Sequence, residues 1–154
     1  MPTKILVLGH RGMLGNAVYK YFSFLSDYEV LTLNTRYGED SFVEEIKSKS
    51  PHYIINCIGI IPQKKPNLAL YKKINIELPI TLEGLGIHTI HPSTDCEFSG
   101  NVASTYKYKK GDVRDATDDY GKSKAEISKH INEDFGNTKI IRTSIIGHEE
   151  KTHL

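Results

Sequence analysis

The sequence has little cysteine and no long apolar run, and each shortage excludes a class of protein. Its 154 residues include two cysteines, Cys57 and Cys96, in different segments and without the spacing of metal ligands. We therefore expect neither a disulfide framework nor a zinc site, and a reducing cytoplasm fits best. The longest apolar runs, such as YIINCIGII, have the length of a strand, and the opening MPTKILVLG lacks signal-peptide architecture. No membrane partner is expected.

The net charge is small as well. A formal charge of +1, from 20 basic and 19 acidic residues, leaves no basic stripe and predicts no nucleic-acid partner. Hydrophobic residues make up 38% and charged residues 25%, which is ordinary for a globular chain. The length predicts one domain over residues 1–154, with a small molecule as the simplest ligand.

Strand-like and helical patterns alternate along the chain. This alternation predicts a Rossmann-like α/β fold, with a doubly wound, mostly parallel sheet flanked by helices. Strands are expected at residues 4–9, 28–34, 52–59, 88–94 and 138–144, and helices at 14–25, 41–50, 67–82 and 119–135. The buried face of the first helix is predicted as Leu14, Ala17, Val18, Tyr21, Phe22 and Leu25. That of the last helix is predicted as Ile127, Ile131 and Phe135, with Asp118 or Thr117 as N-cap and Gly136 as stop. Residues 97–117 form a long polar loop in this prediction.

A glycine turn, GHRGMLG, follows the first strand and opens the first helix, with Gly9, Gly12 and Gly15 three residues apart. Glycine permits a tight turn and lets a phosphate approach bare N–H groups at a helix N-terminus. The turn therefore predicts a phosphate site formed by Gly9, Arg11, Gly12, Met13, Leu14 and Gly15. A glycine-rich connection without a ligand is the alternative.

The second strand ends in Asn34, Thr35 and Arg36, where NAD-selective sites usually carry an acidic residue. Arg36, together with Arg11, can pair with a 2′-phosphate. This favours NADPH as cofactor over NADH, the alternative being that Arg36 is a solvated loop charge.

Two Tyr-x-x-x-Lys pairs occur, Tyr106 with Lys110 and Tyr120 with Lys124. The first lies in a polar run without helical periodicity. The second opens a helix, where positions i and i+4 share a face. A lysine ammonium there is expected to lower the pKa of the phenol and make it a workable acid. We therefore favour Tyr120 and Lys124.

Reduction of a carbonyl also needs a second donor on the carbonyl oxygen, and Thr94 follows the fourth strand. Ligands bind at the carboxyl ends of the strands in open α/β sheets. The candidates at these ends are Gly9, Asn34, residues 57–59, Thr94 and Ser144.

These motifs, in this order, resemble the extended short-chain dehydrogenase/reductase family, and most closely its sugar-nucleotide reductases of the dTDP-4-dehydrorhamnose reductase type. The matching segments are LVLGHRGMLG, IINCIGI, KIN at 73–75, STDCEFSG, DDYGKSKAE and IIRTSIIG. The resemblance implies a Thr-Tyr-Lys triad at Thr94, Tyr120 and Lys124. Tyr120 would protonate the C4 keto oxygen of a nucleotide-linked deoxysugar, Thr94 would bind that oxygen, and Lys124 would hold the nicotinamide ribose.

The same resemblance places Cys57, Ile58 and Gly59 along the cofactor and Asn75 in a polar network beneath it. It implies a nucleotide-sugar substrate and a role in polysaccharide biosynthesis, while the oligomeric state is left open, with a homodimer as one expectation. Family members are nearly twice as long, and their C-terminal part supplies most of the sugar pocket. We therefore expect a cofactor-binding part without its substrate domain, and binding without efficient turnover.

One departure from the family pattern, and the range of functions within the family, keep other functions open. Cys96 stands where the rhamnose-pathway reductases usually have a tyrosine, so the substrate is not fixed. An epimerase or dehydratase of the same family is an alternative, and Asp95 with Glu97 offers the acidic pair that a dehydratase uses. A further alternative is a non-catalytic NADP-binding regulatory module, because the regulatory β subunit of methionine adenosyltransferase also looks like these reductases. The glycine turn could also serve another phosphate ligand.

Overall fold

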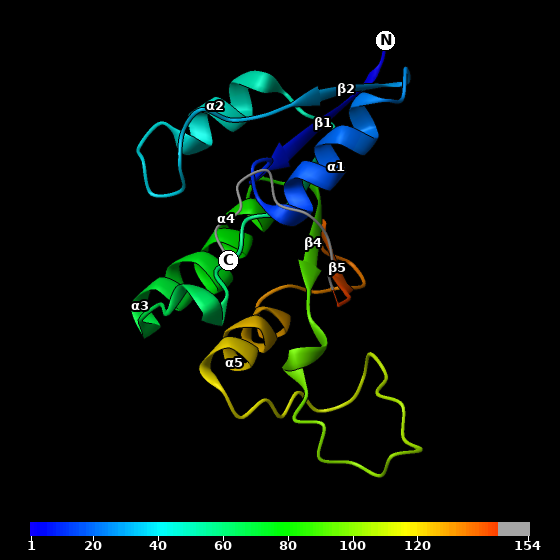
Figure 1. The fold of residues 1–154 in the computed structure, drawn as a ribbon. Helices are drawn as coiled ribbons and strands as arrows, with labels where there is room; N and C mark the ends of the chain where they lie inside the picture. The colour runs from blue at the N-terminus through cyan, green and yellow to red at the C-terminus, as the bar shows by residue number, and fades with distance from the viewer. Residues whose placement is uncertain (145–154) are drawn as a thin grey trace.

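The computed structural model describes residues 1–144, and its centre is a five-stranded sheet in the order β2-β1-β3-β4-β5 (Figure 1). Every neighbouring pair of strands is parallel. The strands are β1 (Thr3–Leu8), β2 (Tyr28–Leu31), β3 (Tyr53–Asn56), β4 (His88–Ser93) and β5 (Thr138–Arg142). Because β2 and β3 flank β1 on opposite sides, the chain reverses direction across the sheet between β1 and β3. In such sheets this switch point is where ligands bind.

Helices cover both faces of the sheet. They are α1 (Met13–Ser23), α2 (Phe42–Lys49), α3 (Leu68–Tyr71), α4 (Leu78–Glu83) and α5 (Asp119–Glu126). Short 3₁₀ turns lie at Pro62–Lys64, Asp95–Glu97 and Ile127–Lys129. The predicted Rossmann-like fold, with a mostly parallel sheet flanked by helices, is confirmed. No helix within residues 1–144 is long and apolar enough to cross a membrane.

Successive residues of β1 point to opposite faces and build two cores. Leu6 and Leu8 pack with Phe42 and Ile46 of α2 and with residues of α4. Ile5 and Val7 pack on the other face, against the Val18 side of α1. A strand covered on both faces must be apolar where it is covered, which explains the unbroken apolar run ILVL at residues 5–8.

One predicted helix contains an unpredicted π segment. The side chain of Asn67 caps the helix by accepting from the Leu70 N–H at 2.8 Å. Helical structure then continues from α3 through the π segment Lys72–Glu77 into α4. Such segments are rare and occur frequently at functional sites.

The predicted buried face of α1 is partly wrong. Its half-buried members are Leu14, Val18 and Phe22, whereas Ala17, Tyr21 and Leu25 are exposed. Gly15 and Asn16 are buried instead. Gly15 lies so close to the glycine turn that a Cβ there would be 2.0 Å from the Gly9 carbonyl oxygen. The helix therefore meets the turn through backbone, and its apolar stripe is narrower than the sequence suggests.

The last predicted helix is too long. Asp118 caps α5 as predicted, accepting from the Gly121 N–H at 2.9 Å. Helix α5 nevertheless ends at Glu126, and Phe135 is 91% exposed rather than buried. The Asn132 side chain accepts hydrogen bonds from the N–H groups of Asp134 and Phe135, which turns the chain out of a helical path.

The second strand is shorter than predicted, ending at Leu31, and the fifth ends at Arg142, two residues before Ser144. The long loop is confirmed: after the 3₁₀ turn, residues 98–118 extend away from the sheet (Figure 1). The end of the IIRTSIIG motif, residues 145–147, lies outside the described residues.

Candidate nucleotide-binding site

The glycine turn shapes the backbone at the switch point. Gly9 has a φ of +73°, and a Cβ there would lie 3.0 Å from the Cys57 carbonyl. Gly15 has no room for a Cβ either, as described above. At Gly12, in contrast, a Cβ would lie 3.5 Å from the Gly9 carbonyl oxygen, an ordinary contact. The protein itself therefore requires glycine at 9 and 15, while at 12 the missing side chain leaves space for a ligand.

Helix α1 begins at this turn with an open N-terminus. Gly12 is its N-cap, and no side chain accepts from the first-turn N–H groups. Uncapped N–H groups at a helix N-terminus favour an anionic ligand.

A cavity of about 710 Å³ lies beside the turn. Seven residues predicted for the cofactor line it: Gly9, Arg11, Gly12, Asn34, Thr35, Arg36 and Ile58. The predicted residues Met13, Leu14, Gly15, Cys57, Gly59, Asn75, Tyr120 and Lys124 do not line this cavity. Sequence reasoning missed Leu8, His10, Thr32, Leu33, Tyr37, Phe42, Leu70, Lys73 and Ile74. No carboxylate is among its lining residues, whereas three cationic side chains are.

Glu45 of α2 fixes the segment that follows β2. Its carboxylate accepts from the Thr35 hydroxyl at 2.7 Å, the Thr35 N–H at 3.0 Å and the Asn34 N–H at 3.1 Å. The Thr35 hydroxyl and the Asn34 N–H hold the pKa of Glu45 below its usual value. The end of β2 itself carries no acidic residue, as the sequence shows; this carboxylate comes from α2 and does not line the cavity.

Asn75 connects the two halves of the site. Its side chain accepts from the Ile60 N–H at 3.0 Å and donates to the Ile60 carbonyl at 3.1 Å and to the Ser123 hydroxyl at 3.0 Å. The loop after β3 is thereby tied to α5. The predicted polar network exists, with Asn75 buried at its centre.

The three residues of the predicted triad come together around the end of β4 and the start of α5. Thr94 follows β4, and its hydroxyl donates to Asp95 at 3.1 Å and accepts from the Cys96 N–H at 3.2 Å. Tyr120 lies in the first turn of α5, half-buried, with its ring centre 6.3 Å from that of Tyr71. Burial raises the pKa of Tyr120 and the Cys96 thiolate would raise it further, while hydrogen bonding by Thr94 partly offsets this.

Lys124 is buried and does not lower the pKa of Tyr120 in this structure. Its amine donates to the Pro92 carbonyl at 3.0 Å and lies 3.3 Å from Nε2 of His91. The expectation that Lys124 depresses the phenol pKa is therefore corrected: the amine faces the sheet. Burial lowers the pKa of Lys124 itself to about 8, against an opposing effect of the Glu97 charge.

The hydrogen bonds beneath Lys124 fix the tautomer of the neutral His91 ring. The Asn56 carbonyl oxygen accepts from the Ile58 N–H at 3.2 Å, which leaves the Asn56 amide nitrogen to donate to Nδ1 of His91 at 3.1 Å. Burial, and next the Lys124 charge, hold the pKa of His91 well below its usual range, so its neutral ring carries the proton on Nε2. An ammonium cannot accept that proton, whereas a neutral amine can.

Glu97 is unavailable for acid-base chemistry. It is fully buried and accepts from Nε of Arg114 at 2.9 Å, from Nε of Arg142 at 2.7 Å and from the Ser93 hydroxyl. Glu133 bonds to both arginines as well. Asp95 remains exposed, so the acidic pair that would mark a dehydratase does not form from Asp95 and Glu97.

The competing pair is not assembled. The Tyr106 hydroxyl donates to Asp112 at 2.9 Å, and the Lys110 amine bonds to Asp134.

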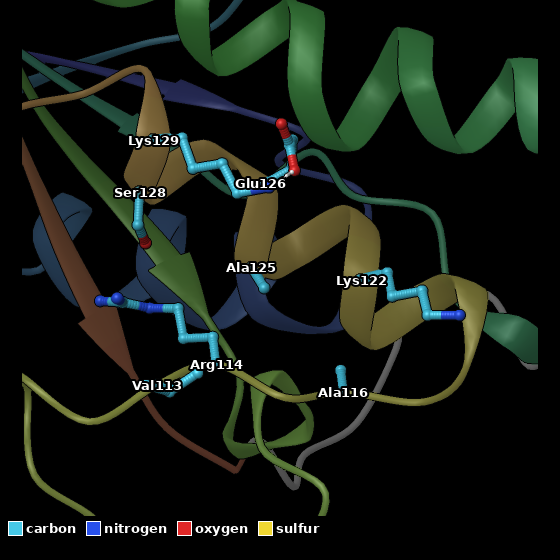
Figure 2. Close-up of a pocket in the computed structure, with 8 residues that line it drawn as sticks. All are labelled: Val113, Arg114, Ala116, Lys122, Ala125, Glu126, Ser128 and Lys129. Carbon is cyan, nitrogen blue, oxygen red and sulfur yellow. Dashed lines mark hydrogen bonds and ion pairs between the residues drawn. The ribbon is translucent and has the colours of Figure 1, made fainter.

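A second cavity, of about 310 Å³, lies between α5 and the long loop (Figure 2). None of the predicted site residues lines it. Within residues 1–144, no cluster of His, Cys, Asp or Glu could hold a metal ion.

The parallel sheet order and the glycine turn after β1 define a class, the Rossmann-like nucleotide-binding domains. The family described as RmlD substrate binding domain matches residues 3–153, so the chain belongs to that family.

Three known proteins show the extent of the similarity. The chain is 28% identical over 167 aligned residues to methionine adenosyltransferase 2 subunit beta of Danio rerio, covering 96% of this chain and 50% of that one. A dTDP-4-dehydrorhamnose reductase from Clostridium acetobutylicum shares its fold at a TM-score of 0.76 and 24% identity, over 92% of this chain and 53% of that one. A Bacillus anthracis dTDP-4-dehydrorhamnose reductase in complex with NADP does so at 0.75 and 19%, over 97% and 57%. The chain therefore spans about half the length of these proteins. Sugar-nucleotide epimerases and dehydratases share the fold too.

Proposed function

We propose that the chain binds NADP(H) in the cavity beside the glycine turn. The observation that carries this proposal is the charge of the lining: Arg11, Arg36 and Lys73 line the cavity and no carboxylate does. A volume of about 710 Å³ is within the usual range of small-molecule sites. The uncapped N-terminus of α1 suits the pyrophosphate and the cations suit a 2′-phosphate.

We further propose that this cofactor serves reduction of the 4-keto group of a nucleotide-linked deoxysugar. Bound NADPH would supply a hydride from its nicotinamide ring. Tyr120 would donate its phenolic proton to the carbonyl oxygen, and the Thr94 hydroxyl would bind the same oxygen. Lys124 would exchange its contact with Pro92 for the ribose hydroxyls, and its charged form would then favour the Tyr120 phenolate.

Titration with NADPH and NADH, followed by nicotinamide fluorescence, tests the cofactor proposal. We expect both to bind, NADPH more tightly. Failure of both to bind would contradict it, and tighter binding of NADH would contradict the role of Arg36.

Because the chain spans about half the length of its relatives, we expect no efficient reduction of a 4-keto nucleotide sugar by these 154 residues. In a full-length relative, replacing the tyrosine equivalent to Tyr120 by phenylalanine should abolish turnover and leave the affinity for the cofactor unchanged.

A non-catalytic regulatory module is the second candidate, favoured by the similarity to a methionine adenosyltransferase subunit over 96% of the chain. It shares the cofactor site, so NADPH binding does not separate the two. An epimerase would also share Tyr120 and Lys124. A chain that binds NADPH and changes the activity of a partner enzyme, with Tyr120→Phe equally effective, would support the module.

A further inference from the structure

One cation of the cavity lining, Lys73, comes from an element other than the glycine turn and the segment after β2. It lies in the π segment Lys72–Glu77, whereas Arg11 and Arg36 lie after β1 and β2. Residues two apart do not share a helix face. Asn75 therefore faces Ile60 and Ser123, while Lys73 faces the cavity.

The Lys73 amine rests on the loop that carries Arg36. A Cβ added to Gly38 would lie 2.5 Å from Nζ of Lys73, so the amine occupies the space of a side chain at that position. Gly38 has a φ of +100°, which also disfavours other residues. Since Gly38 is two residues beyond Arg36, the Lys73 amine lies beside the segment expected to hold the adenosine ribose.

Lys73 differs from its neighbour Lys72 in its charge partners. The Lys72 amine lies 3.8 Å from the Glu77 carboxylate. No carboxylate within residues 1–144 forms an ion pair with Lys73. The Glu45 carboxylate, which accepts from the Thr35 hydroxyl, lies 3.6 Å from the Lys49 amine. Among the described residues, the Lys73 amine is therefore in no ion pair that a ligand would have to break.

We propose that Lys73 is a specificity-determining residue that contacts the 2′-phosphate of NADP(H) from beside the Arg36 segment. This inference rests on the proposed function. The two cations would hold the phosphate between them, Arg36 through its planar fork and Lys73 as a compact charge. NADH has a hydroxyl at this place and gains nothing from a second cation.

Lys73→Gln tests the proposal, with Lys72→Gln as a matched control that removes the same charge from the same segment. Dissociation constants for NADPH and NADH would be measured by nicotinamide fluorescence. Lys73→Gln should weaken NADPH binding about tenfold, the effect of one charge-assisted contact, and NADH binding less than about twofold. Lys72→Gln should change neither by more than about twofold. Lys73→Arg should keep the preference for NADPH.

Three outcomes would overturn the proposal while leaving the proposed function intact. The first is that Lys73→Gln changes NADPH affinity no more than Lys72→Gln does. The second is that Lys73→Gln weakens NADPH and NADH binding equally. The third is that Lys73→Arg loses the preference for NADPH over NADH. Wild-type chain that binds neither dinucleotide would instead overturn the proposed function, and this inference with it. Lys73 is exposed, and circular dichroism of each variant checks that the fold is kept.

Discussion

Along the carboxyl edge of the sheet, the charged groups beside β1 and β2 differ from those beside β4 and β5 in whether they have partners within the protein. At the β1–β2 end, Arg11, Arg36 and Lys73 surround a cavity with no carboxylate in its lining. At the β4–β5 end, Glu97 is surrounded by arginines and Lys124 bonds to Pro92. The β1–β2 end, called the open end below, therefore has an excess of positive charge. At the β4–β5 end, called the closed end, the charged groups bond to one another or to the backbone.

This difference indicates what each end must do before it can act. The open end, beside β1 and β2, can receive an anion without breaking an ion pair within residues 1–144, so its groups are already positioned for binding. At the closed end, Lys124 must leave Pro92 and His91 before it can contact a ribose, so that part must rearrange. The difference can be tested by removing groups from either end.

The largest effect is expected at the closed end. Glu97→Ala leaves Arg114 and Arg142 buried with one carboxylate fewer, which should lower the free energy of unfolding by about 3–5 kcal/mol. The exposed pair of Glu126 and Lys129 provides the control, because Glu126→Ala should cost about 0–1 kcal/mol. Urea unfolding measures both. Similar losses in the two variants would show that the buried charges do not hold this end together.

The buried amine of Lys124 makes stability depend on pH. Its pKa is about 8 in the folded chain, lowered by burial from an ordinary 10.5. Between these values the unfolded chain binds a proton that the folded chain does not, so raising the pH stabilises the fold. The destabilisation is on the order of 3 kcal/mol below about pH 8 and fades toward pH 10.5.

Lys124→Met removes this dependence. We expect wild type to gain stability relative to Lys124→Met as the pH rises from 7.5 to about 10, measured by urea unfolding of both proteins. Other titrations are common to the two proteins and cancel in the difference. If the difference in free energy of unfolding between the two proteins is constant over this range, the amine is not desolvated. The closed end would then be more accessible to water than the structure indicates.

Glycines of the turn separate stability from binding at the open end. Gly15→Ala places a Cβ 2.0 Å from the Gly9 carbonyl oxygen and should cost about 1–3 kcal/mol in thermal or urea unfolding. Gly12→Ala meets the same oxygen at 3.5 Å, so it should fold normally and instead weaken NADPH binding. Normal stability of Gly15→Ala would contradict the close packing of α1 on the turn, and unchanged binding by Gly12→Ala would contradict a ligand at that N-terminus.

Local sequence was sufficient for the fold and for residues that follow strands directly. Continuous apolar runs identify β1 and β3, and the glycine spacing identifies the turn. The end of β2 was mispredicted because Asn34 and Thr35 donate their N–H groups to Glu45, which lies eleven and ten residues further along the chain. Phe135 was mispredicted because Asn132 redirects the backbone. In both cases a side chain competes with the regular backbone bonds that periodicity assumes.

The sequence predicted residues of the candidate site only where a reactive residue type stands within a recognisable motif. Thr94, Tyr120 and Lys124 are recognisable by type and place, but the direction of the Lys124 amine depends on His91, 33 residues earlier. Lys73 stands in the KIN segment without any local sign of its role. Only the β3–β4 connection, which packs beside α2 in the same core, brings it to the loop after Arg36.

The smallest effect is expected where one carboxylate fixes the wall of the open end. Glu45→Gln keeps an acceptor for Thr35 but loses the charge, which should lower the free energy of unfolding by about 1 kcal/mol. Glu44→Gln is the matched control, since the exposed Glu44 bonds only to the exposed Lys47 and should cost less. Because the pKa of Glu45 is lowered in the folded chain, its contribution is present above its ordinary value of 4.5 and is lost as the pH falls through the folded value. Urea unfolding at pH 7 and at pH 3 should therefore show the difference between wild type and Glu45→Gln shrinking in acid. A difference that persists unchanged at pH 3 would mean that shape rather than charge holds Asn34 and Thr35, and that the wall of the open end is fixed without electrostatics.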